Sequence, residues 1–242
     1  MFCWPSKHSG AGPPPLSIER NKPIVCYVTD RKTLKSDDPS ADALARIRAA
    51  IAAGTDWVEI REKDLSGKKL LDLVRQAVSA SSSARRGATQ DAVRILVNDR
   101  LDVAMAAGAA GVHLGRASAP AQDVVRWCRK GNAPPDFLVG VSCHNLDDVL
   151  EAVAASASYV FFGPVFDTPS KRRFGPPQGI EQLKEVCQTV QIPVVAIGGV
   201  DEKNAAECIR GGAAGIAAIR LFQGETDQAA LEKVVTLLHG LR

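Results

Sequence analysis

Residues 160–183, VFFGPVFDTPSKRRFGPPQGIEQL, begin as an apolar run typical of a buried strand and end as the start of a helix. A long segment rich in glycine and proline joins the two parts. It carries hydroxyl groups and three consecutive cations, Lys171, Arg172 and Arg173. A loop that served only as a connection could be much shorter. The stretch therefore predicts a strand, an anion-binding loop and a helix in succession.

The same alternation of strand and helix continues in both directions along the chain. The apolar runs are unbroken, as expected for strands that are covered on both faces of a sheet. Eight strand–helix units predict an α/β protein with a single (β/α)8 TIM barrel, and a doubly wound open sheet is the competing arrangement. The strands are expected at 24–30, 57–62, 94–99, 111–115, 137–143, 159–165, 193–199 and 215–222.

The length of the chain suits one such barrel. It has 242 residues, of which 45% are hydrophobic, and TIM barrels typically need about 250 residues. No internal boundary divides the chain, so we expect one barrel domain over residues 23–242. Residues 1–22 are rich in glycine, proline and serine and are expected to form a flexible leader.

Composition excludes several classes of protein. The net charge of +3 is too small for the dense basic face of a nucleic-acid binder. No apolar stretch approaches the roughly 20 residues of a membrane span. The six cysteines lack CxxC spacing, which favours core thiols in a reducing compartment over disulfides or a zinc site. The first 22 residues make a poor signal peptide. We therefore expect a cytoplasmic protein, and the sequence allows a homo-oligomer.

Polar residues gather at the ends of the predicted strands, where TIM barrels carry their active sites. The simplest alternative is that strand ends meet water and are polar for that reason. Gly198 and Gly199 follow the seventh strand, where loops of many barrels bind phosphate through backbone N–H groups. The other strand ends carry Arg61-Glu62-Lys63, Asn98-Asp99-Arg100, His113-Leu114-Gly115, Ser142-Cys143-His144 and the loop of Thr168.

Six motifs resemble the thiamine phosphate synthase family, which also includes the TenI-type thiazole tautomerases. They occur in the order of that family between residues 57 and 222, and the pattern GP-x-F-x-T-x-S-K is the most specific of them. The motifs are EIREKD at 59–64, VNDRLDVA at 97–104, GVHLG at 111–115, GVSCHNLDD at 140–148, FGPVFDTPSK at 162–171 and AIGGV at 196–200.

The resemblance implies a reaction between two small phosphorylated molecules. A synthase of this type joins hydroxymethylpyrimidine pyrophosphate to thiazole phosphate and releases pyrophosphate. Hydroxyl groups and lysine suit a pyrophosphate, because they supply hydrogen-bond donors and a mobile charge. By resemblance, the catalytic residues are Arg61, Lys63, Ser142, His144 and Lys171; the substrate-binding residues are Glu59, Asn98, His113, Thr168, Ser170, Gly198, Gly199, Ile219 and Arg220; and Asp99 binds Mg²⁺.

The sequence also departs from the synthase pattern. Synthases usually have HLGQED after the fourth strand, and the last acid is a second magnesium ligand. This chain has HLGRAS, with Arg116 in place of glutamine and Ser118 in place of the acid. A serine hydroxyl is a poor replacement for a carboxylate on Mg²⁺. Glu59 stands for a glutamine that faces the pyrimidine, and Arg220 stands for a serine after the eighth strand.

These departures leave two alternatives open. A TenI-type tautomerase aromatises a thiazole carboxylate phosphate without magnesium, and His144 would be its acid and base. A barrel that binds thiazole phosphate or thiamine phosphate without turnover would also tolerate the loss of a metal ligand. The loop from Thr168 to Lys171 and the carboxylate of Asp99 favour the synthase, which is therefore the first expectation.

Overall fold

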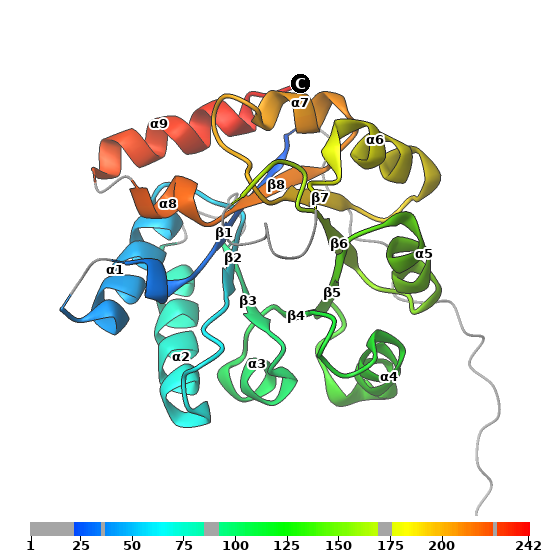
Figure 1. The fold of residues 1–242 in the computed structure, drawn as a ribbon. Coiled ribbons are helices and arrows are strands. Elements are labelled where there is room, and N and C mark those ends of the chain that lie inside the picture. Colours follow the sequence, from blue (N-terminus) through cyan, green and yellow to red (C-terminus); the bar gives the residue numbers. More distant parts are fainter. Residues whose placement is uncertain (1–21, 35–36, 85–91, 169–175, 225–226) are drawn as a thin grey trace, which may run out of the picture.

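The computed structural model describes residues 22–34, 37–84, 92–168, 176–224 and 227–242. Within them, eight parallel strands close into a barrel in chain order, and β8 pairs with β1 (Figure 1). This confirms the expected TIM barrel. The strands are β1 (Ile24–Val28), β2 (Trp57–Ile60), β3 (Arg94–Asn98), β4 (Gly111–Leu114), β5 (Leu138–Cys143), β6 (Tyr159–Phe162), β7 (Val194–Ile197) and β8 (Gly215–Ala218).

Helices surround the barrel on its outer side (Figure 1). Two of them begin at side-chain caps: the side chains of Ser66 and Asn145 accept hydrogen bonds from the backbone N–H groups of Lys69 and Asp148. The helices are η1 (Arg31–Thr33), α1 (Pro39–Ala52), α2 (Gly67–Ser83), α3 (Leu101–Ala107), α4 (Ala121–Trp127), η2 (Cys128–Asn132), α5 (Leu146–Ala154), α6 (Gly179–Thr189), α7 (Ala205–Arg210), α8 (Arg220–Gly224) and α9 (Gln228–His239).

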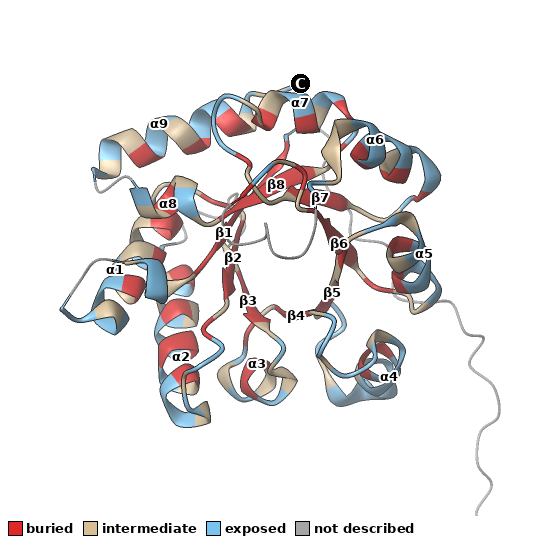
Figure 2. Ribbon diagram, viewed as in Figure 1, coloured by how far each residue is buried: buried red, intermediate tan, exposed pale blue. Residues whose placement is uncertain are grey.

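The strands are buried on both faces, which explains their unbroken apolar sequences (Figure 2). One apolar cluster lies between the strands and the helices. A second cluster fills the barrel interior and includes the rings of Trp57, Tyr159 and Phe161. Gly140 makes room for one of these rings, because a Cβ atom there would lie 2.1 Å from Cζ of Tyr159. The interior is therefore a packed core below the mouth of the barrel.

The eighth strand is shorter than expected. The apolar pattern predicts a strand over 215–222, but β8 ends at Ala218 and α8 begins at Arg220. Phe222 is buried from the helix rather than from a strand, with its ring 5.1 Å from that of Tyr27. Gln223 donates a hydrogen bond to the carbonyl oxygen of Asp30 at 3.0 Å. Contacts with β1 and the following turn therefore favour a helix over the last residues of this apolar run.

Three further expectations concern the leader, membrane-spanning helices and the cysteines. Residues 1–21 of the expected leader lie outside the described residues. Within the part of the chain that the structure describes, no helix is long and apolar enough to cross a membrane. The five cysteines found there are all free, as the sequence predicts.

Asp56 connects the residues at the start of β1 with the end of α9 at the bottom of the barrel, opposite the mouth. Its carboxylate accepts hydrogen bonds from Nε2 of His239 at 2.7 Å, Nζ of Lys22 at 2.8 Å and the backbone N–H of Val25 at 2.9 Å. Burial alone would raise the pKa of Asp56, but these hydrogen bonds outweigh it and hold the pKa below its ordinary value. The ionised carboxylate therefore stabilises the docking of α9 against β1.

We predict that Asp56→Asn lowers the free energy of unfolding by about 1–3 kcal/mol at pH 7, since the partly buried donors of Val25 and His239 lose a charged acceptor. A lowered native pKa gives stability that is present above the unfolded pKa of about 3.9 and is lost as the pH falls through the native pKa. The deficit should therefore shrink below about pH 4. Urea denaturation at pH 7 and pH 3.5 measures both effects.

Asp123→Asn is the matched control, because Asp123 pairs with Arg126 at 3.5 Å where both side chains are more than half exposed. Its effect should stay within about 0.5 kcal/mol. Equal losses in the two variants would contradict a special role for Asp56.

Candidate active site

Parallel closure of the barrel brings the C-terminal ends of all eight strands to one mouth. Arg61 and Lys63 follow β2 there, and Arg61 donates its backbone N–H to Oγ1 of Thr29 at 3.0 Å. Thr29 is fully buried at the end of β1. The loop after β2 is therefore attached to the neighbouring strand at the point where the predicted cations begin.

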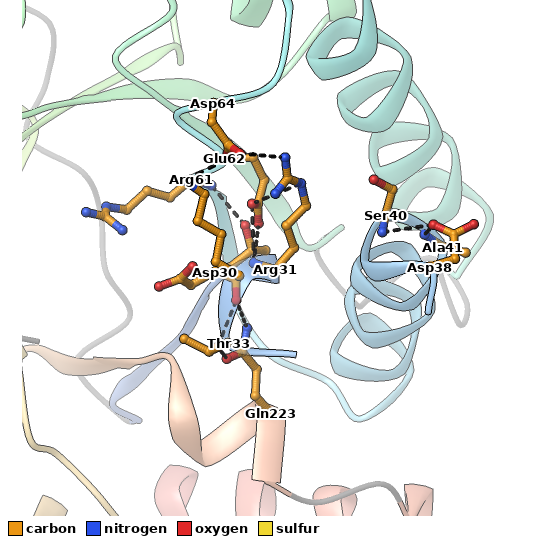
Figure 3. A network of polar contacts seen from close by, with 12 residues as sticks. Asp30, Arg31, Thr33, Asp38, Ser40, Ala41, Arg61, Glu62, Asp64 and Gln223 are labelled. Atoms are coloured by element: carbon orange, nitrogen blue, oxygen red, sulfur yellow. Dashed lines mark hydrogen bonds and ion pairs between the residues drawn. The ribbon is translucent and has the colours of Figure 1, made fainter. Parts of the chain in front are cut away.

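An acidic pair beside these cations is bound by another residue, Arg31. The backbone N–H of Arg31 donates to both carboxylate oxygens of Glu62 at 3.1 and 3.2 Å, and its Nη2 donates to Oδ2 of Asp64 at 2.9 Å. Nε of Arg31 lies 3.8 Å from Glu62. We call Arg31, Glu62 and Asp64 the arginine cluster. Figure 3 shows that the side chain of Arg61 extends away from it.

The arginine cluster separates the acids of the sequence REKD from its cations. Glu62 is buried and Asp64 is also 3.4 Å from Lys32. Among the described residues, neither Arg61 nor Lys63 has an ion-pair partner. Arg61 is partly buried, so its charge is less screened than that of an exposed arginine. Two positive charges at the mouth are therefore available to an anionic ligand.

Glu59 and Asn98 form a hydrogen-bonded pair below these cations. Nδ2 of Asn98 donates to Oε1 of Glu59 at 3.0 Å. Only 1% of the surface of Glu59 is exposed, and burial raises its pKa to about 7 against the opposing effects of Arg61, Asn98 and Lys63. Near neutral pH this carboxyl group can accept or donate hydrogen bonds, depending on whether it is protonated.

Asp99 is the candidate magnesium ligand at the end of β3. Its φ of 65° is unusual for a residue other than glycine, and its backbone N–H donates to the carbonyl oxygen of His113 at 2.8 Å. The described residues contain no group of three or more His, Cys, Asp or Glu side chains suited to a metal. One exposed carboxylate still fits Mg²⁺, which commonly takes one or two carboxylates together with substrate phosphates and water.

Ser118, which replaces the second acid, belongs to a closed turn. Its Oγ accepts a hydrogen bond from the backbone N–H of Gly115 at 2.8 Å, and its own N–H donates to the carbonyl oxygen of Gly115 at 3.0 Å. Arg116 lies exposed in this turn. The serine hydroxyl therefore has a local structural role, which a carboxylate in the same place could also fill.

His113 lies beneath the mouth, between Tyr159 and Ser142. Its Nδ1 is 3.0 Å from the Tyr159 hydroxyl, and its Nε2 is 2.8 Å from Oγ of Ser142. Burial, assisted by the charge of Arg61, lowers the pKa of His113 to about 3. The imidazole is therefore neutral at physiological pH, and Ser142 stands between it and the mouth.

His144 follows β5 and is fixed by two hydrogen bonds. Its Nδ1–H donates to the carbonyl oxygen of Gly163, and its backbone N–H donates to Oδ2 of Asp148 at 2.8 Å. A carbonyl oxygen can only accept, so Nδ1 carries a hydrogen and Nε2 of the neutral ring is left as an acceptor. This arrangement suits a ligand donor or a proton transfer.

The loops after β6, β7 and β8 meet at the other side of the mouth. Gly198 and Gly199 have φ values of 93° and 70°, and a Cβ atom at Gly199 would lie 2.7 Å from Cβ of Phe166. Nη2 of Arg220 donates to Oγ1 of the buried Thr168 at 3.3 Å. These glycines therefore allow a turn and a close approach at the expected phosphate site.

Of the remaining predicted site residues, the structure describes Ile219 but not Ser170 or Lys171. Ile219 packs against the interior cluster, whereas Ser170 and Lys171 lie outside the described residues. Sequence reasoning missed Thr29, Arg31 and Tyr159. The change from apolar to polar residues in VTDR at 28–31 is the same signal that marks the other strand ends, so the first two could have been found. No local pattern points to Tyr159.

We predict that Glu59→Gln changes how stability depends on pH. A carboxyl group with a raised native pKa binds its proton more tightly when folded, so the wild type loses stability as the pH rises from 4.5, the ordinary pKa, to about 7, the native pKa. Glutamine keeps the acceptor for Asn98 and does not titrate. The variant should gain about 2 kcal/mol relative to the wild type between pH 5 and pH 8.

Urea denaturation at the two pH values measures this gain, and Glu151→Gln on the exposed face of α5 is the control. Parallel stability curves for the wild type and Glu59→Gln would show that burial does not perturb Glu59.

Comparisons with known proteins agree with this geometry. The family described as thiamine monophosphate synthase matches residues 25–222. A putative thiamine-phosphate synthase of Geobacter sulfurreducens is 41% identical over 77% of this chain and 82% of its own. The thiamine-phosphate synthase of Methanoculleus marisnigri is 40% identical over 84% of this chain and 90% of its own.

A solved structure supports the same relationship. The thiamine phosphate pyrophosphorylase of Pyrococcus furiosus superposes with a TM-score of 0.75 and 28% identity, and the match covers 93% of this chain and 99% of the other. The matched residues, 25–222, include residues of all eight strands of the barrel. The chain belongs to the thiamine monophosphate synthase family.

Proposed function

We propose that this chain is a thiamine phosphate synthase, which couples hydroxymethylpyrimidine pyrophosphate with thiazole phosphate. The observation that carries the proposal is the pair of cations, Arg61 and Lys63, without acidic partners among the described residues. A protein that needed them only for folding would pair them with Glu62 and Asp64, which lie beside them in the sequence. Their availability suits the pyrophosphate group of the first substrate.

The chemistry requires a leaving group to be stabilised. The bond between the pyrimidine methylene carbon and the pyrophosphate oxygen breaks, and its electron pair leaves with pyrophosphate. The thiazole nitrogen then donates its lone pair to the resulting cation and forms the new C–N bond. Arg61 and Lys63, with Lys171 by family resemblance, would stabilise the negative charge that develops on pyrophosphate. Fixed cations provide this stabilisation without reorganisation during the reaction.

The two substrates would occupy different parts of the mouth. Glu59 and Asn98 offer acceptor and donor groups to the polar edge of the pyrimidine. The turn of Gly198 and Gly199 contacts the loop after β6, where the N–H of Phe166 donates to the carbonyl oxygen of Gly198, and Arg220 at the start of α8 donates to Thr168 of the same loop. Glycine turns of this kind bind phosphate through backbone N–H groups. This division would direct the thiazole phosphate to β7 and β8, and the pyrophosphate to β2 and the loop after β6.

Magnesium would be held by Asp99 together with pyrophosphate oxygens and water. When bound, the metal neutralises charge on the leaving pyrophosphate. Asp99 supplies an exposed carboxylate at the end of β3, and Ser118 adds no charge. We therefore infer that magnesium binds this chain weakly until pyrophosphate is present.

A tautomerase or a binding protein without activity would use the same barrel. Because Nδ1 of His144 donates to Gly163, Nε2 is the ring nitrogen left for the proton transfer that a tautomerase needs. The names of the relatives support the synthase instead, since the one at 40% identity is called a thiamine-phosphate synthase and the one at 41% a putative thiamine-phosphate synthase. The available cations also favour a pyrophosphate substrate, which the tautomerase reaction lacks.

The decisive experiment supplies the purified protein with both precursors and magnesium. We expect formation of thiamine phosphate and an equal amount of pyrophosphate, and no product when magnesium is removed by chelation. A parallel assay offers thiazole carboxylate phosphate alone. Isomerisation of that compound without magnesium, together with no coupling, would replace the synthase by the tautomerase. Tight binding of thiamine phosphate without either reaction would identify a binding protein.

We predict that Ser118→Asp strengthens magnesium binding. A carboxylate restores an anionic oxygen at this turn and can keep the hydrogen bond from the N–H of Gly115. Calorimetric titration with magnesium in the presence of pyrophosphate should show about tenfold tighter binding. Ser118→Asn is the matched control, because it has similar size without charge. Equal magnesium affinity in the two variants would remove this turn from the metal site.

A further inference from the structure

Three side chains form a hydrogen-bonded chain from the barrel interior to the mouth. Tyr159 lies at the beginning of β6, His113 on β4 and Ser142 near the end of β5. The Tyr159 hydroxyl is 3.0 Å from Nδ1 of His113, and Nε2 of His113 is 2.8 Å from Oγ of Ser142. Tyr159 and His113 are almost fully buried, whereas Ser142 is partly exposed. The serine is therefore the end of the chain that a ligand can reach.

The hydrogens in this chain can point in either of two directions. A neutral imidazole has one N–H donor and one acceptor. If Nδ1 carried the hydrogen, it would donate to the hydroxyl oxygen of Tyr159, and the hydroxyl of Ser142 would donate to Nε2. The phenol hydrogen of Tyr159 would then lack an acceptor, because His113 is the only hydrogen-bond partner of this hydroxyl among the described residues. A buried donor without a partner is costly.

The opposite direction satisfies every buried donor. Tyr159 donates its phenol hydrogen to Nδ1, and Nε2–H of His113 donates to Oγ of Ser142. The hydroxyl hydrogen of Ser142 is then available to an acceptor at the mouth. Donation by the imidazole also polarises the serine oxygen and strengthens this outward hydrogen bond.

We propose that Tyr159 is a positioning residue that makes Ser142 a hydrogen-bond donor to the substrate, acting through the tautomer of His113. Ser142 would donate to an anionic or lone-pair oxygen or nitrogen, such as a pyrophosphate oxygen or a pyrimidine ring nitrogen. The part that concerns the substrate rests on the proposed function. The direction of the internal hydrogen bonds does not.

The packing around Tyr159 leaves its ring little freedom to move. The ring lies against Gly140, where a Cβ atom would be only 2.4 Å from the hydroxyl oxygen. The ring centroids of Trp57 and Phe161 lie 4.7 and 5.4 Å from its own. Fixed packing of this kind keeps the hydroxyl on Nδ1, as a positioning role requires.

Tyr159→Phe removes one oxygen atom and keeps the ring. We expect kcat/KM for coupling to fall about tenfold, as for other residues that orient a contacting group. In a Ser142→Ala background, the same substitution should cause no further loss, because the serine hydroxyl through which it acts is gone. A merely structural role would lower activity in both backgrounds and would contradict the proposal.

The ring ¹⁵N chemical shifts of His113 test the direction without any activity. The chain has four histidines, and comparison with His113→Asn assigns these signals. The wild type should show a protonated Nε2 and an unprotonated Nδ1, and Tyr159→Phe should shift the signals towards the other tautomer. A protonated Nδ1 in the wild type would overturn the proposal. Absence of coupling by the wild type would contradict only the proposed function, and these shifts would still decide the direction.

Tyr27→Phe is the matched control, since Tyr27 is the other tyrosine of the chain and is also buried. Its hydroxyl accepts a hydrogen bond from Gln223 and has no connection to Ser142. This variant should leave the His113 signals unchanged. A shift as large as that in Tyr159→Phe would assign the effect to general loosening of the core and would overturn the proposal.

Discussion

Gly215 lies where β8 meets β1, and closure of the barrel depends on its missing side chain. A Cβ atom there would lie 2.3 Å from the carbonyl oxygen of Ile24, its register partner on β1. Closure places the loops after β8, β1 and β2 next to one another at the mouth, where Gln223 bonds to the carbonyl oxygen of Asp30. The hydrogen bond from Arg61 to Thr29, which joins the ends of β2 and β1, lies at the same side of the mouth. The position of the candidate site therefore follows from the closed sheet.

Charge separation at this edge links the fold to the proposed chemistry. Arg31, from the loop after β1, binds Glu62 and Asp64 from the loop after β2 (Figure 3). The formal charges of the sequence REKD at 61–64 cancel, because it has two cations and two acids. In the folded protein Arg31 pairs with the acids of this sequence, whereas its cations, Arg61 and Lys63, form no ion pair within the described part of the chain. A concentrated positive charge can thus arise in a chain whose net charge is only +3.

The eight strands could be predicted from the sequence because strands buried on both faces have unbroken apolar runs. The end of β8 could not, because Phe222 is equally apolar in a strand or in the helix that packs it on Tyr27. The site residues at strand ends could be named from motifs, but their partners could not. The neutral state of His113 and its contact with Tyr159 arise from strands β4 and β6, which are not neighbours in the barrel.

The pyrophosphate affinity of Arg31→Gln tests the role of the arginine cluster most directly. Arg31 would not touch the anion, but the loss of its guanidinium frees Asp64 to pair with Arg61 or Lys63. It also removes the positive charge 3.8 Å from Glu62, although the backbone hydrogen bonds to Glu62 remain. Calorimetric titration should show pyrophosphate binding weakened about tenfold or more in this variant and in Arg61→Gln, with no change in Lys130→Gln on the outer surface. Unchanged affinity in Arg61→Gln would contradict the assignment of the anion site, and unchanged affinity in Arg31→Gln alone would contradict the role of charge separation.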